Sequence, residues 1–161
     1  DGLIIATTSI PSTITKSRFL TRVVISPKPT TAGITNVVDS EIFGPKIPLD
    51  IMIVMPCSGN TLAKLAIGIN DNAVTMACKS TLRNEHYVVL AIATNDALSN
   101  SGKNIMQILN TKHFYLVPMY QDDCIKKPNS MLFDETLVIQ TVINAINNNQ
   151  LQPVFEGVKD D

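Results

Sequence analysis

The chain has 161 residues, a formal net charge of −1 and a pI near 6.1, and 45% of its residues are hydrophobic. This length predicts a single domain over residues 1–161 with a substantial core. The near-neutral charge gives no reason to expect a nucleic acid or an acidic membrane as a partner. No apolar run approaches the ~20 residues needed to cross a bilayer, and no signal peptide is expected.

The cysteine and histidine content indicates a reducing compartment and no structural metal. Cys57, Cys78 and Cys124 are odd in number and widely spaced, which fits free thiols in the cytoplasm better than a disulfide framework. Only His86 and His113 accompany them, and there is no Cys-x-x-Cys motif, so the usual ligands of a zinc site are missing. We therefore expect a cytoplasmic protein without a metal site.

The segment before Leu49 gives a weak pattern. Three short apolar segments are candidate strands, namely Leu3–Ala6, Arg22–Ser26 and Ile34–Val38. Hydroxyl-rich and proline-containing stretches between them indicate loops. No helical periodicity occurs before Leu62, although a doubly wound domain normally alternates strands and helices from its start.

A strand, a polar loop and a helix follow one another next. Leu49–Met55 is a continuous apolar run, as expected for a parallel strand buried on both faces. The loop Pro56–Thr61 then places hydroxyls, an amide and backbone N–H groups at the carboxyl end of that strand, where open α/β sheets bind ligands. Asn60 or Thr61 is predicted to cap the helix, whose first N–H groups favour an anion. The alternative is an ordinary capped helix without a ligand.

Gly59 and the helix after it have specific expected roles. A glycine in this loop allows the backbone to approach a ligand closely or to take a positive φ. The helix is predicted to bury one apolar face, formed by Leu62, Leu65, Ala66 and Ile69.

The remainder of the chain alternates between helical and strand patterns. The expected elements are a helix at Ala73–Arg83, a strand at Tyr87–Ala93, a helix at Asn100–Asn110, a strand at His113–Met119, a polar connection at Tyr120–Phe133 and a helix at Asp134–Asn148. This order predicts an α/β fold with three layers, a Rossmann-like or flavodoxin-like parallel sheet with helices on both faces.

A second polar loop, Thr94-Asn95-Asp96, follows the strand Tyr87–Ala93. Because parallel neighbouring strands end at the same edge of a sheet, we expect this loop to lie close to Cys57–Thr61. An asparagine amide there can donate to a carboxylate or polarise a carbonyl without titrating. The alternative is that Asn95 and Asp96 only cap the next helix.

The polar loops also carry a family resemblance. Pro56–Thr61, with the sequence PCSGNT, and the Ala63–Ala66 segment after it resemble the Pro-Ala-Ser-Ala-Asn-Thr region of the flavin-containing cysteine decarboxylase superfamily. Further blocks are similar to the family of dipicolinate synthase B subunits: Gly44–Lys46, Val88–Asp96, Lys103–Ile105, Asn110–Lys112, Gln121–Asp123, Lys126–Ser130 and Leu151–Pro153. The similarity is continuous over about Glu41–Val154.

The resemblance implies an FMN cofactor and an active-site asparagine. It assigns flavin contacts to residues of both polar loops, namely Cys57, Ser58, Gly59, Asn60, Thr61 and Thr94. Asn95 matches the family's active-site asparagine near the substrate and is the predicted catalytic residue. A thiol packed in the core is the alternative role for Cys57.

The activity that the resemblance implies is formation of pyridine-2,6-dicarboxylate from a dihydro- or hydroxytetrahydro-dipicolinate precursor in sporulating bacteria. An oxidised flavin would accept a hydride as the ring becomes aromatic, while the protein holds flavin and substrate face to face. The implied partner is the dehydrogenase-like A subunit of dipicolinate synthase, and a homo-oligomer is expected. One alternative is a non-catalytic flavoprotein-like scaffold that assembles this A-type partner. The second alternative is a different FMN-dependent enzyme, either a decarboxylase or a prenyltransferase.

The chain departs from the family pattern at two points. The decarboxylases carry a Pro-x-Met-Asn-x-x-Met-Trp block, whereas this chain has Ala93–Leu98 and no tryptophan, so decarboxylation of a peptidyl cysteine is not supported. The family also opens with a strand, a Gly/Ser-rich phosphate loop and a helix. No such segment is recognisable here, and we expect the chain to be a fragment or to lack residues at its start. Ser9 and Thr13 are then the remaining candidates for a phosphate contact.

Four other polar residues complete the set of candidates. His113 begins an apolar strand and is expected to be structural, and His86 lies in a polar turn and is expected to be exposed. Lys126 and Lys127 can meet a dicarboxylate or a flavin phosphate as point charges, or simply form a solvated loop. Polar connections as long as Gln121–Ser130 are often functional or mediate contacts between subunits.

Overall fold

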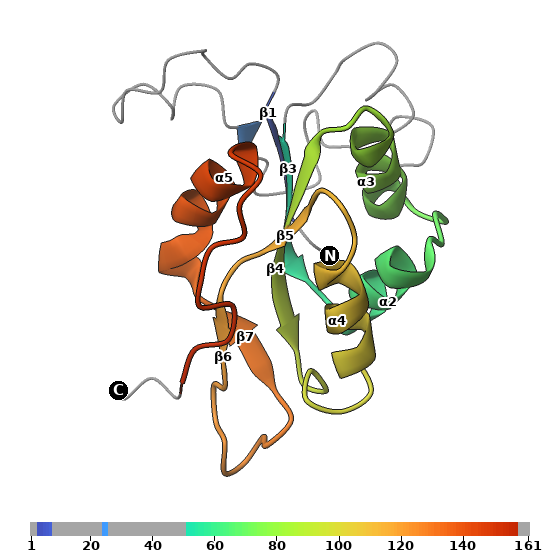
Figure 1. Ribbon diagram of the computed structural model, residues 1–161. Helices are drawn as coiled ribbons and strands as arrows, with labels where there is room; N and C mark the ends of the chain where they lie inside the picture. Colours follow the sequence, from blue (N-terminus) through green and yellow to red (C-terminus); the bar gives the residue numbers. More distant parts are fainter. Residues whose placement is uncertain (1–2, 8–23, 26–50, 158–161) are drawn as a thin grey trace.

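The computed structural model describes residues 3–7, 24–25 and 51–157 (Figure 1). The predicted strand Ile34–Val38 and the phosphate candidates Ser9 and Thr13 lie outside these residues. The described elements are β1 (Leu3–Thr7), β2 (Val24–Ile25), β3 (Ile51–Cys57), α2 (Gly59–Ile67), α3 (Ala73–Arg83), β4 (Tyr87–Thr94), α4 (Gly102–Leu109), β5 (Phe114–Leu116), β6 (Met119–Tyr120), β7 (Met131–Phe133), the 3-10 turn η2 (Glu135–Leu137) and α5 (Val138–Ile146).

Three parallel strands, β3, β4 and β5, form the centre of the sheet, as predicted. Antiparallel strands flank them: β1 pairs with β3 and β2 with β1 on one side. On the other side β4 has two partners. Its first half pairs with β5, and its last residues pair antiparallel with β7, so that Thr94 lies opposite Met131. The expected α/β fold is therefore confirmed, with a parallel centre and antiparallel margins.

Helices cover both faces of the sheet, which makes three layers (Figure 1). On β3, Met52 and Val54 join the cluster under α2, α3 and α4, whereas Ile51 and Ile53 join the cluster under α5. The residues of β4 alternate between the two faces in the same way. Each fully buried aliphatic side chain contributes about 1.5–3 kcal/mol, so these apolar runs stabilise the sheet from both sides. The continuous apolar pattern of the two strands is explained by this double covering.

The element boundaries agree with the sequence prediction for one helix and differ for others. Helix α3 has the predicted bounds because Asn72 and Thr75 form a reciprocal capping box at its start. Strand β3 continues two residues beyond the predicted end and includes Pro56 and Cys57, whereas the predicted start at Leu49 lies outside the described residues. Helix α2 ends earlier than predicted, at a left-handed Gly68, so Ile69 lies beyond the helix and is 43% exposed.

The polar connection after β5 differs from the prediction. The expected strand His113–Met119 is divided into β5 and β6. The last hydrogen bond to β4 runs from the Val117 N–H to the Leu90 carbonyl, and beyond it the chain pairs with β7 instead. The expected connection Tyr120–Phe133 contains β7, which pairs with β6 to form a hairpin. The two strands are joined by residues 121–130, at the bottom of the view in Figure 1. This hairpin brings a distant part of the chain to the end of β4.

The three cysteines are free. Cys57 and Cys78 are buried, and Cys124 is exposed in the hairpin loop. Within residues 51–157 and the two short described strands, no group of three acidic, cysteine or histidine side chains is placed to hold a metal ion. Among the helices of the same residues, none has the length and apolar character that a membrane span requires.

Candidate functional site

The first polar loop is shorter than the sequence suggests. Strand β3 ends at Cys57 and helix α2 begins at Gly59, so only Ser58 lies between them. Ser58 has an extended backbone, and its Oγ accepts a hydrogen bond from the Thr61 N–H at 3.4 Å. The prediction that Asn60 or Thr61 caps this helix is therefore wrong. Both residues lie in the first turn, because Ser58 already supplies the capping oxygen.

Gly59 brings the start of α2 against the loop that follows β4. A Cβ atom at Gly59 would lie 2.7 Å from Thr94 Oγ1 and 3.3 Å from both Asp96 Oδ1 and Ser101 Oγ. The only glycine with a positive φ among the described residues is Gly68, so Gly59 is needed for close approach. The approach is to the protein's own polar loop. The two loops thus meet at the carboxyl edge of the sheet, as predicted.

Asp96 organises the second polar loop. Its Oδ1 accepts a hydrogen bond from Thr94 Oγ1 at 2.5 Å, and its backbone carbonyl accepts from the N–H groups of Ser99 and Ser101. The hydroxyls of Thr94 and Ser101 lower the pKa of Asp96 below its ordinary value, because they stabilise the charged form. Asp96 is therefore ionised at neutral pH and holds this turn together, but it does not cap α4, whose cap residue is Ser101, so the alternative that Asn95 and Asp96 cap that helix is wrong.

Asn95 lies beside this turn with its side chain exposed. Its amide oxygen accepts a hydrogen bond from Ser130 Oγ at 3.4 Å, and Ser130 lies just before β7 and is only 4% exposed. The cap residue of α4 is Ser101, so Asn95 does not cap that helix. Because Asn95 and the residue before α2, Ser58, are both exposed at this edge, their polar groups can meet a ligand.

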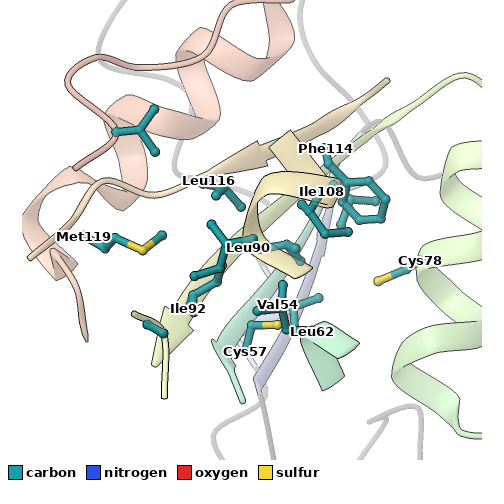
Figure 2. Packing of buried hydrophobic residues seen from close by; sticks show 14 of the residues in the cluster. Val54, Cys57, Leu62, Cys78, Leu90, Ile92, Ile108, Phe114, Leu116 and Met119 are labelled. Atoms are coloured by element: carbon teal, nitrogen blue, oxygen red, sulfur yellow. The ribbon is translucent and has the colours of Figure 1, made fainter. Parts of the chain in front are cut away.

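Cys57 is the predicted site residue with the least access to a ligand. Its side chain is fully buried, and it lies next to Val54 and Leu62 (Figure 2). Burial raises the pKa of the Cys57 thiol to about 12, so the group stays protonated. The structure thus favours a packed thiol over a thiol that touches a flavin.

An apolar cavity of about 370 Å³ lies behind the Asn95 turn. Leu98 and Met106 line it from the turn and from α4, and Phe155 lines it from the carboxyl-terminal segment. These three side chains are 52%, 55% and 41% exposed, and Lys103 is the charged lining residue. The sequence did not indicate this cavity, because Phe155 and Met131 reach it only through the tertiary fold.

The other polar candidates lie away from this edge or are engaged elsewhere. His113 is at the opposite edge, where its Nε2 lies 2.9 Å from Glu85 Oε2, which agrees with the structural role expected for it. His86 is half-buried, so the expectation that it is exposed is wrong. Lys127 pairs with Asp122 at 3.2 Å in the exposed hairpin loop. None of these groups has a hydrogen bond to Asn95 among the described residues, and the loop of Lys127 reaches Asn95 only through Ser130.

Ser130 is the residue at this site that the sequence interpretation missed. It belongs to a block that carries the family resemblance, but no local pattern connects it with Asn95. The connection depends on the pairing of Thr94 with Met131, which are far apart in the sequence. Such a contact is not visible in hydrophobic periodicity.

Known proteins are similar to this chain over most of its length. The B subunit of dipicolinate synthase from Bacillus subtilis is 46% identical over 123 residues, which cover 76% of this chain and 62% of the relative. The crystal structure of the dipicolinate synthase B subunit from Bacillus halodurans has a TM-score of 0.74 and 42% identity, and the match covers 76% of this chain and 63% of that chain. The chain thus spans less than two thirds of either relative.

The family model named Flavoprotein matches residues 12–148. This range includes both polar loops and the helices α2 to α5. It also includes residues outside the described part of the chain. The chain belongs to the Flavoprotein family.

Proposed function

We propose that this chain is the flavin-binding part of a B subunit of the dipicolinate synthase type. Its reaction would be the formation of pyridine-2,6-dicarboxylate from a dihydro- or hydroxytetrahydro-dipicolinate precursor during sporulation. The observation that carries the proposal is the joined pair of polar loops, in which Gly59 contacts Thr94 and leaves Asn95 exposed. Family membership and the similarity to two dipicolinate synthase B subunits support the cofactor class and the reaction.

The exposed polar groups at this edge fit the polar rim of a flavin ring. Ser58 and Asn60 offer a hydroxyl and an amide, and Thr61 adds a half-buried hydroxyl. Such groups bind a ring through hydrogen bonds without adding charge. A bound FMN would supply the acceptor for the hydride that the dihydro precursor loses, together with one proton, as its ring becomes aromatic. Asn95 would hold a substrate carboxylate beside that ring.

Asp96 limits which part of a flavin can bind at α2. Its Oδ1 would lie 3.3 Å from a Cβ on Gly59, so a negative charge already lies beside the first turn of the helix. This charge offsets the positive end of the helix dipole, which would otherwise attract a phosphate. We therefore assign the contacts of α2 to the flavin ring. The same observation favours the second candidate, a scaffold without cofactor that assembles a partner chain.

The proposed partner is a dehydrogenase-like A subunit. The relatives are named as subunits, which supports assembly with a second chain, and we also propose that the chain forms a homo-oligomer. We place it in the cytoplasm, because the two buried cysteines and exposed Cys124 are all free.

Absorbance of the purified protein tests the cofactor. The protein should show the flavin bands and release FMN on denaturation, or take up added FMN. Colourless protein that takes up no FMN would contradict the cofactor and favour the scaffold.

Substitution of Asn95 tests the catalytic role. Asn95→Ala should abolish formation of pyridine-2,6-dicarboxylate in the reconstituted two-subunit system, with an unchanged melting temperature. Asn100→Ala is the matched control, because Asn100 is an exposed asparagine in the same connection between β4 and α4. Equal activity of the two variants would refute the role of Asn95.

A further inference from the structure

The hairpin formed by β6 and β7 is tied to the Asn95 turn by its backbone. Leu98 N–H donates to the Asn129 carbonyl at 3.0 Å, and Thr94 pairs with Met131 across the two strands. The residue between these two contacts, Ser130, donates its own N–H to the Lys127 carbonyl at 3.0 Å. The backbone position of Ser130 relative to Asn95 is therefore fixed on both sides.

The side chains of Ser130 and Asn95 meet at this junction. Ser130 is 4% exposed, and its Oγ donates to Asn95 Oδ1 at 3.4 Å. An asparagine amide has an acceptor end and a donor end. With Oδ1 turned toward Ser130, the Nδ2 group points the other way, and it has no acceptor among the side chains and carbonyls of the described residues. Asn95 is exposed, so this donor is available to a ligand.

Asp122 competes for the same hydroxyl hydrogen. The Ser130 hydroxyl stabilises the Asp122 carboxylate and is the largest cause that lowers the pKa of Asp122, and Lys127 adds to this effect. A hydroxyl has one hydrogen to donate. Lys127 Nζ lies 3.2 Å from Asp122 Oδ2 and gives that carboxylate a donor besides Ser130, while the contact of Ser130 Oγ with Asn95, at 3.4 Å, is made to the amide oxygen Oδ1. The hairpin loop thus contains the groups that set the orientation of the Asn95 amide.

We propose that Ser130 is a positioning residue that holds the Asn95 amide with its Nδ2 group toward the ligand, and so selects a ligand that presents a carboxylate there. The inference rests on the proposed function, in which Asn95 meets a dicarboxylate. The hairpin then contributes to the site through Ser130 without contacting the ligand itself. Ser130 acts on the ligand only through Asn95.

The orientation can be measured in the ligand-free protein by NMR. The side-chain amide signal of Asn95 is identified by its loss in Asn95→Ala, and its ¹⁵N relaxation reports whether the group is ordered. We expect an ordered Asn95 amide in the wild type and a mobile one in Ser130→Ala. Ser99→Ala is the matched control, because Ser99 lies on the same turn and its hydroxyl donates to the Asp96 carbonyl, not to Asn95. It should leave the Asn95 signal unchanged.

A second variant keeps the shape of the residue. Ser130→Cys retains a side chain of similar form with a weaker donor, and we expect it to leave the Asn95 amide with intermediate order. An Asn95 amide as ordered in Ser130→Ala as in the wild type would overturn the proposal. If the alanine variant does not fold, unchanged order in Ser130→Cys would overturn it in the same way.

Titration with pyridine-2,6-dicarboxylate separates this inference from the proposed function. In the wild type the probe should shift the Asn95 amide signal, and Ser130→Ala should raise its Kd about three- to tenfold, the range of one neutral hydrogen bond. Failure of the wild type to bind the probe, with Asn95 still mobile in Ser130→Ala, would refute the ligand class and support the positioning role. Equal Kd values in the wild type and in Ser130→Ala would refute the selection of the carboxylate by Ser130.

Discussion

The two edges of the sheet carry polar residues that are used in different ways. At the amino edge, Glu85 precedes β4 and His113 precedes β5, and both have a positive φ, of 60° and 68°. Their side chains bond to each other, since His113 Nε2 lies 2.9 Å from Glu85 Oε2. Lys112 also bonds to this carboxylate. The Glu85 carboxylate at this edge therefore has its partners within the protein.

At the carboxyl edge the polar groups are only partly satisfied from within. Asp96 bonds to Thr94, but Asn95 remains exposed and has one hydrogen bond, from Ser130. Asn60 is exposed in the first turn of α2. Exposed amide groups such as these, held at the ends of strands, are available for hydrogen bonds to a ligand.

The comparison shows why a perturbed pKa does not by itself identify a functional site. The pKa of Glu85, lowered to about 2, is explained first by Lys112 and then by His113, both of which are structural partners. Asn95 does not titrate, yet its exposed amide is the side chain that we propose to contact the ligand. At the amino edge the unpaired atoms Asn84 Nδ2 and His113 Nδ1 are buried, whereas Asn95 is exposed, so exposed hydrogen-bonding capacity separates the two edges better than charge does.

The largest effect is expected when the carboxyl edge is forced apart. Gly59→Ala places a Cβ 2.7 Å from Thr94 Oγ1, and Thr94 cannot easily move because it is β-branched and bonded to Asp96. Overpacking of this kind costs about 1–3 kcal/mol, which corresponds to a fall in Tm of about 3–9 °C for a domain of this size. Calorimetry measures the fall, and we expect FMN uptake to be lost as well.

Gly157→Ala is the control for this substitution, because a Cβ there meets nothing within 4 Å. It should leave the Tm and FMN uptake unchanged. If Gly59→Ala behaved like Gly157→Ala, the close contact between the two loops would not be required for the site.

A smaller effect, on stability alone, is expected at the amino edge. Glu85→Gln removes a carboxylate whose folded-state pKa is about 2, below its ordinary value of 4.5. A lowered pKa stabilises the folded state above the unfolded value, and the contribution is lost as the pH falls from about 4.5 toward 2. Because Glu85 is 68% exposed and solvent screens its pairs, the variant should melt only slightly below the wild type at pH 7, and the difference should shrink between pH 4.5 and 2.

Thermal unfolding of both proteins across this pH range checks the prediction, with FMN uptake at pH 7 as the second measurement. Uptake should be unchanged, because Glu85 lies at the edge opposite Asn95. A constant difference in Tm down to pH 2 would show that charge on Glu85 does not stabilise the fold. Loss of FMN uptake would contradict the separation of the two edges.

The sequence predicted the features that depend on local pattern. Strands β3 and β4 read as continuous apolar runs because helices cover both faces of the sheet. The bounds of α3 were predicted correctly because an asparagine cap and an apolar stripe coincide. The meeting of the two polar loops followed from the parallel order of the strands.

Features decided by contacts distant in sequence were not predictable. Ser58, Asn60 and Thr61 are all good capping residues, so local propensity could not show that Ser58 caps α2. Strand β7 has only three residues, and it forms by pairing with Ala93 and Thr94 at the end of β4. Without β7, nothing in the sequence relates Ser130 to Asn95. The ligand roles given to the loop residues remain predictions for the experiments above.

The smallest effect is expected from Lys112, and it tests how the amino edge holds Glu85. Lys112 contributes most to the low pKa of Glu85, but their side chains are 72% and 68% exposed, so solvent and salt screen the pair. His113 is only 11% exposed and keeps its contact with Glu85 in the variant. Lys112→Met should therefore lower the Tm by about 1 °C or less, and 0.5 M salt should remove the difference. A fall as large as that of Glu85→Gln, unchanged by salt, would mean that the exposed lysine, and not the half-buried histidine, holds this edge together.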